Sequence, residues 1–517
     1  MATTAGDLAQ AYAFEGPALE LGSVVLDGTA SPEARVRIPL SMLTRHGLVA
    51  GATGTGKTKT LQLMAEQMSS AGIPVFLADI KGDVSGVAAP GADSERIRTR
   101  AADTGTAWSP SAFPAEFLSL GGLGPGIPVR ATMTSFGPVL LSKVLGLNDT
   151  QESSLGLVFH FADKAGLPLL DLKDLRSVIH HLVGEQGTQD LEGLGGLSKA
   201  TAGVILRELI GLEDQGGDVF FGEPEFDSAD LLRVTPDGLG VLSVMGLTAV
   251  QDKPQLFSTF LLWLLADLFQ DLPEVGDLDQ PKLVFFFDEA HLLFDDASEA
   301  FLDAIARTVR LIRSKGVGVF FVTQTPKDVP AEVLAQLGNR VQHALRAFTP
   351  DDAKALKATV STFPTSEAYD LTSLLTSLGI GEAAVTVLTE RGTPTPVVWT
   401  MLRPPASSMA PAGADLLQEE VAGSELLAKY ATTVDRESAY ERLLGRLAPP
   451  EEPADAPRRD APARTHERAG DGGAISDLLG SSVFRSFARS AASAAGREIT
   501  RSLFGTAKRR RRSSGSW

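Results

Sequence analysis

The feature that most constrains this chain is a cluster of glycines between a short apolar run and a helical pattern. The stretch HGLVAGATGTGKTKTLQLMAEQM runs from residue 46 to residue 68. Its spacing fits G-x-x-x-x-G-K-[ST], the phosphate-binding loop, with Gly51 first and Gly56, Lys57 and Thr58 closing the match. The run before the loop ends like a strand, and apolar residues after it recur at helical spacing. The sequence therefore predicts a strand, a phosphate-binding loop and a helix in that order.

A loop of this kind binds a nucleoside triphosphate through backbone N–H groups that the glycines let converge on phosphate oxygens, aided by the helix dipole. We expect Lys57 to reach the β- and γ-phosphates of ATP, and the Thr58 hydroxyl to bind Mg²⁺. The residues predicted to contact the nucleotide are Gly51, Ala52, Thr53, Gly54, Thr55, Gly56, Lys57, Thr58 and Lys59.

A second candidate segment, LVFFFDEAH, is an apolar strand that ends in Asp288 and Glu289. Two adjacent carboxylates are costly to desolvate at the end of a buried strand, so they indicate a function. We expect Asp288 to hold Mg²⁺, mostly through water, and Glu289 to orient or deprotonate the attacking water. The alternative is a strand that merely ends at a charged surface. His291 fits a surface histidine as well as a residue that couples the site to a partner.

The next strand, GVGVFFVTQTP, ends at Gln324, whose amide can hydrogen-bond the γ-phosphate or the water; a polar turn is the alternative. Just before it, Arg307, Arg310 and Arg313 follow one another at three-residue steps on a predicted helix. They form either a solvated basic face or a source of one arginine that acts on a neighbouring subunit's γ-phosphate.

Strand patterns alternate with helical patterns through most of the chain, which predicts an α/β fold with a mostly parallel sheet covered on both faces. A helical insertion interrupts this alternation. We expect these segments: 1–45, an N-terminal β segment; 46–138, the first part of the core; 139–235, the helical insertion; 236–405, the second part of the core with a C-terminal hairpin; 406–447, a helical segment; 448–475, a disordered linker; and 476–517, a basic amphipathic tail.

Composition excludes several other kinds of site and divides the charge unevenly. There are no cysteines, so disulfides, thiolate metal sites and cysteine nucleophiles are excluded, which suits a cytoplasmic protein. We expect no N-terminal signal, because the first residues lack a basic start and an apolar stretch. The apolar segment 256–269 is short for a bilayer and contains Asp267, so we expect a buried core helix. The net charge of −17 divides into +8 from residue 481 onward and −25 before it.

Several segments together resemble the bacterial HerA-like helicase family of the HerA/FtsK superfamily. They are RHGLVAGATGTGKT, FLADIKGD, FFFDEAH, IARTVRLIRSKGVGVFFVTQTP and LGNRVQHALRAFTPDD, and the likeness runs from about Arg35 to Pro405. The resemblance implies a hexameric ring ATPase with a RecA-like core. It also implies that Arg313 is the arginine finger acting in trans, with Arg346 a second candidate.

The C-terminal tail combines a narrow apolar stripe with nine Lys or Arg side chains after residue 480. Such a segment can lie on an anionic membrane, bind nucleic-acid phosphates, dock on an acidic partner or the protein's own acidic body, or simply be solvated.

Three functions remain open from the sequence. The first is an ATP-driven DNA translocase or helicase of the HerA/FtsK type. The second is a ring ATPase that remodels or secretes protein. The third is an ATP-dependent scaffold that recruits a partner nuclease, although an intact Glu289 argues against a protein that does not hydrolyse ATP.

Overall fold

The computed structural model describes residues 4–191, 195–295 and 297–447, so the expected linker and basic tail lie outside the described residues. The described chain contains a twelve-stranded sheet in the order β2-β1-β12-β11-β10-β3-β9-β8-β4-β7-β5-β6. From β10 to β6 neighbouring strands are parallel, and from β2 to β10 they are antiparallel. The strands are β1 Ala18–Leu26, β2 Thr29–Pro39, β3 Gly47–Ala50, β4 Val75–Asp79, β5 Ala115–Leu120, β6 Ile127–Val129, β7 Leu242–Gly246, β8 Leu283–Phe287, β9 Val317–Thr323, β10 Asn339–Gln342, β11 Glu382–Thr386 and β12 Val398–Leu402.

Both faces of the parallel part are buried, as strand β8 shows. Side chains alternate across a strand, and Phe285 and Phe287 enter one apolar cluster while Val284 and Phe286 enter another. Helix α10 (Pro254–Asp271) packs in the first cluster and helix α2 (Lys57–Ser70) in the second. A strand buried on both faces reads as an unbroken apolar run, which explains the pattern LVFFF. The predicted α/β fold with a mostly parallel sheet is confirmed.

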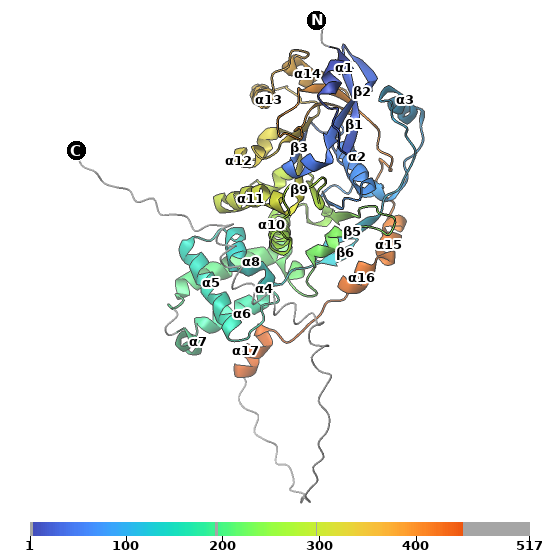
Figure 1. The fold of residues 1–517 in the computed structure, drawn as a ribbon. Coiled ribbons are helices and arrows are strands. Elements are labelled where there is room, and N and C mark those ends of the chain that lie inside the picture. The colour runs from blue at the N-terminus through green and yellow to red at the C-terminus, as the bar shows by residue number, and fades with distance from the viewer. Residues whose placement is uncertain (1–3, 192–194, 296, 448–517) are drawn as a thin grey trace, which may run out of the picture.

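The remaining helices group around this sheet (Figure 1). Helices α4 to α9 lie between β6 and β7 in the chain and gather on one side, while α15 and α16 run beside β5 and β6 and α17 packs on α6. The helices are α1 Ala5–Gln10, α3 Glu95–Asp103, α4 Met133–Val144, α5 Asp149–Lys164, α6 Leu172–Leu182, α7 Glu185–Asp190, α8 Lys199–Leu212, α9 Asp218–Phe220, α11 Glu299–Ile312, α12 Ala331–Leu334, α13 Pro350–Ser361, α14 Leu371–Ser377, α15 Ala414–Gly423, α16 Glu425–Tyr430 and α17 Ala439–Leu447. The division of the chain into seven segments stays a prediction.

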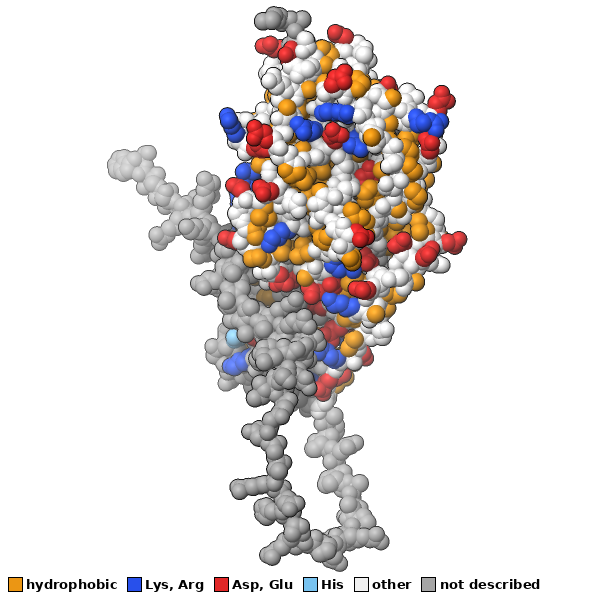
Figure 2. Space-filling model, turned by 45° about the vertical axis from the view of Figure 1, so that its right-hand side comes forward, with side chains coloured by type: hydrophobic (Ala, Val, Ile, Leu, Met, Phe, Trp, Pro, Cys, Tyr) orange, Lys and Arg blue, Asp and Glu red, His pale blue; other side chains and the backbone are white. Residues whose placement is uncertain are grey.

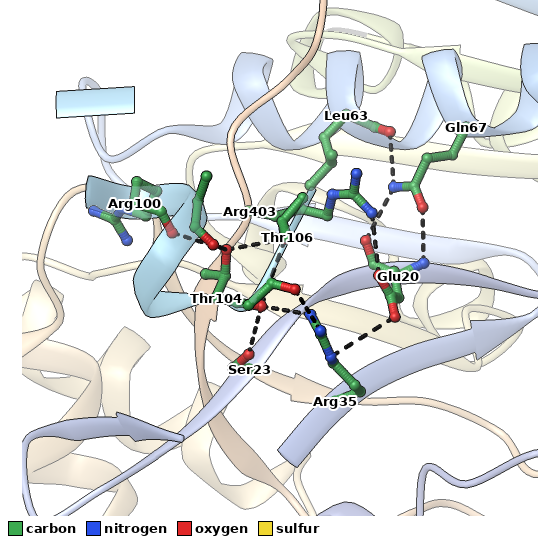
Figure 3. A network of polar contacts seen from close by, with 11 residues as sticks. Glu20, Ser23, Arg35, Leu63, Gln67, Arg100, Thr104, Thr106 and Arg403 are labelled. Atoms are coloured by element: carbon green, nitrogen blue, oxygen red, sulfur yellow. Dashed lines mark hydrogen bonds and ion pairs between the residues drawn. The ribbon is translucent and has the colours of Figure 1, made fainter. Parts of the chain in front are cut away.

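The N-terminal hairpin β1–β2 joins the main sheet, because β1 pairs with β12. A polar network holds it to the helices behind (Figure 3). The Glu20 carboxylate lies 3.2 Å from the Arg403 guanidinium, and the Glu20 backbone N–H donates to Gln67 of α2 at 2.8 Å. Arg35 donates to the carbonyls of Thr104 and Gly105, just after α3. The hairpin, α2 and α3 are therefore cross-linked by hydrogen bonds.

Among residues 4–191, 195–295 and 297–447, no helix is both long enough and apolar enough to cross a membrane. The apolar segment expected as a core helix lies in α10, where Leu256, Phe260 and Trp263 are buried.

Candidate nucleotide-binding site

The glycine-rich loop connects β3 to α2, and its glycines adopt backbone conformations that other residues rarely adopt. The φ angles of Gly51, Gly54 and Gly56 are 155°, 79° and 115°. A Cβ on Gly51 would stand 2.5 Å from the Cβ of His343, closer than two carbon atoms can approach. Position 51 therefore requires glycine, both for its backbone conformation and because a larger side chain would clash with His343.

Hydrogen bonds from three other segments fix the loop. The Gly51 N–H donates to Thr323 at the end of β9 at 3.2 Å, and the Ala52 N–H donates to Ala344 after β10 at 2.8 Å. From the opposite side, the Gly381 N–H donates to the carbonyl of Thr55 at 3.0 Å. The first N–H groups of α2 have no partner within the helix, so they are available to phosphate oxygens.

The predicted phosphate-binding lysine, Lys57, is folded against its own loop in this structure. Its Nζ donates to the carbonyl of Gly51 at 2.7 Å, and the residue is 7% exposed. Burial lowers the pKa of Lys57, and the charges of Glu289 and Asp288 oppose that shift. The contact of Lys57 with the β- and γ-phosphates stays a prediction.

Asp288, the residue after β8, is a deeply buried acid, and one of its carboxylate oxygens has no hydrogen-bond partner among the described residues. It is 2% exposed, and its Oδ1 accepts the Glu289 N–H at 2.9 Å. Burial and the neighbouring Glu289 charge raise the pKa of Asp288 to about 7. Its Oδ2 is buried and accepts no hydrogen bond within the described part of the chain. A buried oxygen without a partner fits a cation ligand. The expected binding of Mg²⁺ by Asp288 and Thr58 stays a prediction.

Glu289 follows in a left-handed conformation, with φ 46° and ψ 49°, and is 5% exposed. Its Oε1 accepts a hydrogen bond from the ammonium group of Lys81. Its Oε2 lies 3.3 Å from Nδ1 of His291, close enough for an ion pair but not aligned as a hydrogen bond. A buried carboxylate in a strained backbone position, with an ammonium group and an imidazole beside it, indicates a functional role.

An open cavity of about 530 Å³ lies in front of Glu289. Its lining comes from the ends of strands β4, β8 and β9 and from the segment before α10: Ile80, Lys81, Gln251, Asp252, Glu289, His291, Leu292 and Gln324. The predicted residues Glu289 and Gln324 thus share a cavity, and His291 lines it too. No residue of the glycine loop is among the residues that line it, so the place of a nucleotide's γ-phosphate stays a prediction.

The candidate arginines lie elsewhere. Arg313 is in the 3₁₀ helix η7 (Arg313–Lys315), at the start of β9, whereas Gln324 follows its end. Seven strand residues at about 3.3 Å each separate the two by roughly 20 Å. Arg313 lies 3.4 Å from the exposed Asp277. Arg346 follows β10 at the same edge as the glycine loop and is exposed. The structure therefore does not bring Arg313 to the site of its own chain.

Sequence reasoning missed two residues of this site. Lys81 belongs to the quoted segment FLADIKGD but received no role, and His343 lies beneath the glycine loop with its Nε2 2.8 Å from the Thr60 hydroxyl. Lys81 could have been found by the rule that located Glu289, because β4 and β8 are parallel neighbours and their carboxyl ends meet at one edge.

The loop of β3 and α2, the carboxylates after β8 and the polar residue after β9 all lie at the carboxyl edge of one parallel sheet. Together they define a P-loop ATPase with a RecA-like core. The chain belongs to the family described as helicase HerA-like C-terminal, whose model matches residues 25–512. It is thus an ATPase of the HerA/FtsK type, and the resemblance noted from the sequence is confirmed.

Two curated relatives carry the name DNA double-strand break repair helicase HerA. The protein of Sulfurisphaera tokodaii is 20% identical over 380 residues, covering 71% of this chain and 68% of the relative. The protein of Saccharolobus solfataricus is 20% identical over 387 residues, covering 73% and 68%.

Solved structures with a similar chain trace include a conjugative coupling protein and a VirB4 protein. The bacterial conjugative coupling protein TrwBdeltaN70 matches with a TM-score of 0.49 and 17% identity, covering 78% of this chain and 95% of that chain. VirB4 of Thermoanaerobacter pseudethanolicus matches with a TM-score of 0.45 and 15% identity, covering 78% and 99%.

Proposed function

We propose that the protein is an ATP-hydrolysing ring motor that acts on duplex DNA as a translocase or helicase. One observation carries the ATPase part: the glycine loop, Asp288, Glu289 and Gln324 meet at one edge of the sheet, although they lie far apart in sequence. The DNA part is supported by the family and by the name of its curated relatives.

In this proposal each side chain has a defined task. The loop from Gly51 to Lys59 binds the phosphates. The Lys57 ammonium group exchanges its hydrogen bond to the Gly51 carbonyl for contacts with phosphate oxygens. Mg²⁺, held by Thr58 and Asp288, would neutralise charge on the β- and γ-phosphates. Glu289 accepts the proton of the attacking water, and Gln324 orients that water or the γ-phosphate.

We propose that the protein assembles into a hexameric ring, in which Arg313 acts on the γ-phosphate of a neighbouring subunit. A finger about 20 Å from its own site along β9 can reach a γ-phosphate only in another subunit. Arg346, exposed at the nucleotide edge, is the second candidate for that role.

The charge distribution bears on where DNA would bind. In the face drawn in Figure 2, basic and acidic side chains are interspersed, and no continuous basic stripe crosses the described part of that face. Residues before 481 carry −25, so we propose that DNA binds in the ring channel and that the +8 segment after residue 480 supplies a second, salt-sensitive contact to DNA or an anionic membrane. A partner nuclease fits the same proposal, and the cysteine-free composition suits the cytoplasm.

The test measures ATP turnover by the full chain in three conditions: alone, with duplex DNA, and with an unfolded protein as the alternative substrate. Lys57→Ala is the control for contaminating ATPase. Stimulation of several-fold by duplex DNA supports the proposal. Stimulation by unfolded protein alone would replace it with a protein-remodelling or secretion motor, and absence of turnover would leave an ATP-dependent scaffold.

A further inference from the structure

A second lysine lies at the nucleotide site besides the one in the glycine loop. Lys81 follows β4, which pairs in parallel with β8 so that Ala78 stands opposite Phe287. Lys81 and Glu289 come three and two residues after this pair, at the same edge of the sheet. The Lys81 ammonium donates to Oε1 of Glu289, while 45% of its side chain stays exposed to the cavity.

The turn that carries Lys81 is fixed by a buried carboxylate. Asp79, the last residue of β4, is 1% exposed. Its Oδ1 accepts the N–H groups of Gly82 at 2.7 Å and Asp83 at 3.2 Å, and its Oδ2 accepts that of Val84 at 3.1 Å. The backbone around Lys81 is therefore rigid, and only its flexible side chain is free to move between partners.

With Lys81 in place, Oε1 of Glu289 is engaged by an ammonium group, and Oε2 is buried without a hydrogen bond from the described residues. Lys81 occupies Oε1, and Oε2 faces Nδ1 of His291 at 3.3 Å. Lys57 is also turned inward, onto the Gly51 carbonyl. Lys57 comes after β3 and Lys81 after β4, and both strands end at the carboxyl edge of the sheet. Two lysines at the edge where a nucleotide's phosphates would bind supply positive charge suited to a polyanion.

We propose that Lys81 is a second phosphate-binding lysine, which leaves Glu289 for the γ-phosphate of ATP and thereby frees Oε1 to accept the proton of the attacking water. ADP ends at its β-phosphate and leaves the Lys81–Glu289 pair intact. Lys81 thus couples the arrival of a triphosphate to release of the general base. The inference rests on the proposed ATPase function and assigns a residue that senses the γ-phosphate.

The test compares the affinities of the full chain for ADP and for the non-hydrolysable imido analogue of ATP, both with MgCl₂, by calorimetry. Lys81→Met should weaken binding of the analogue about tenfold, because a charge-assisted hydrogen bond is lost, and should leave the ADP affinity within about twofold. Lys81→Arg keeps the positive charge and should restore most of the preference. Steady-state ATP hydrolysis should fall in Lys81→Met.

A matched control breaks another Lys–Glu pair far from this site. Lys143 and Glu152 lie 2.7 Å apart between α4 and α5, and Lys143→Met should change neither nucleotide affinity. The inference is overturned if Lys81→Met binds both nucleotides as the wild type does, weakens both equally, or hydrolyses ATP faster. Failure of the wild type to bind either nucleotide would instead overturn the proposed function.

Discussion

Acidification should destabilise the floor of the nucleotide site through one buried histidine. His343 is fully shielded from solvent, and burial together with the charge of Lys57 lowers its pKa from 6.5 to about 4. Its Nδ1 has no hydrogen-bond partner among the described residues, and burial outweighs the backbone contacts that favour the protonated form. The protein must therefore keep this imidazole neutral in the folded state.

The direction in which pH changes the free energy of unfolding depends on whether the folded or the unfolded chain binds the proton first. Between about pH 6.5 and pH 4 the unfolded chain protonates His343 while the folded protein does not, so the free energy of unfolding falls as the pH falls through this window. A difference of roughly 2.5 pKa units implies a loss of about 2 kcal/mol between pH 7 and pH 4.5. Asp288 and Asp79, whose pKa values are raised to about 7 and about 6, contribute in the opposite sense, so the histidine has to be isolated by substitution.

The assay is urea unfolding of wild type and His343→Gln at pH 7 and pH 4.5, followed by fluorescence and circular dichroism, whose coincidence tests two-state behaviour. Between the two pH values the wild type should lose about 2 kcal/mol more than His343→Gln. His180→Gln, at an exposed position, serves as the matched control and should follow the wild type. Equal losses in the wild type and in His343→Gln would refute the reasoning.

Three further predictions concern the motor. Lys57→Ala should weaken nucleotide binding as measured by calorimetry, since its charge meets the phosphates in ground and transition states alike; unchanged affinity would remove Lys57 from the site. Arg313→Ala should bind ATP normally but hydrolyse it 10³- to 10⁵-fold more slowly. Mixing it with Lys57→Ala subunits should recover activity at interfaces that combine one intact phosphate-binding loop with one intact arginine finger. Co-assembled mixtures that never recover activity would exclude action in trans. Removing residues 476–517 should weaken binding to DNA or anionic vesicles at low salt, with ATP turnover changed less than about twofold; loss of turnover would mean that the tail serves the ring.

The sequence predicted those features of the site that depend on local pattern. The glycine loop needs only its own spacing and a strand and helix on either side, and the pair Asp288–Glu289 stands out because charge follows an unbroken apolar strand. The structure places both features at the carboxyl edge of one parallel sheet, and Glu289 lines the cavity there. The mostly parallel sheet followed from the alternation of strand and helix patterns.

Contacts between distant segments could not be predicted in the same way. Strands β5 and β6 gave no clear signal, and the pairing of β1 with β12 depends on residues nearly four hundred positions apart in the chain. The roles of Lys81 and His343 depend on strand order, which decides that β4 lies next to β8 and β10 next to β3. A lysine or histidine alone carries no such information, because either is most often a surface or a packing residue.

The central claim, that Glu289 is the base of an ATPase built at this sheet edge, is tested most directly by Glu289→Gln. We predict that the full chain with this substitution binds Mg·ATP at least as tightly as the wild type and hydrolyses it 10²- to 10⁴-fold more slowly in a single turnover, because an amide cannot accept the proton. Hydrolysis at a near-normal rate, with binding intact, would contradict the account.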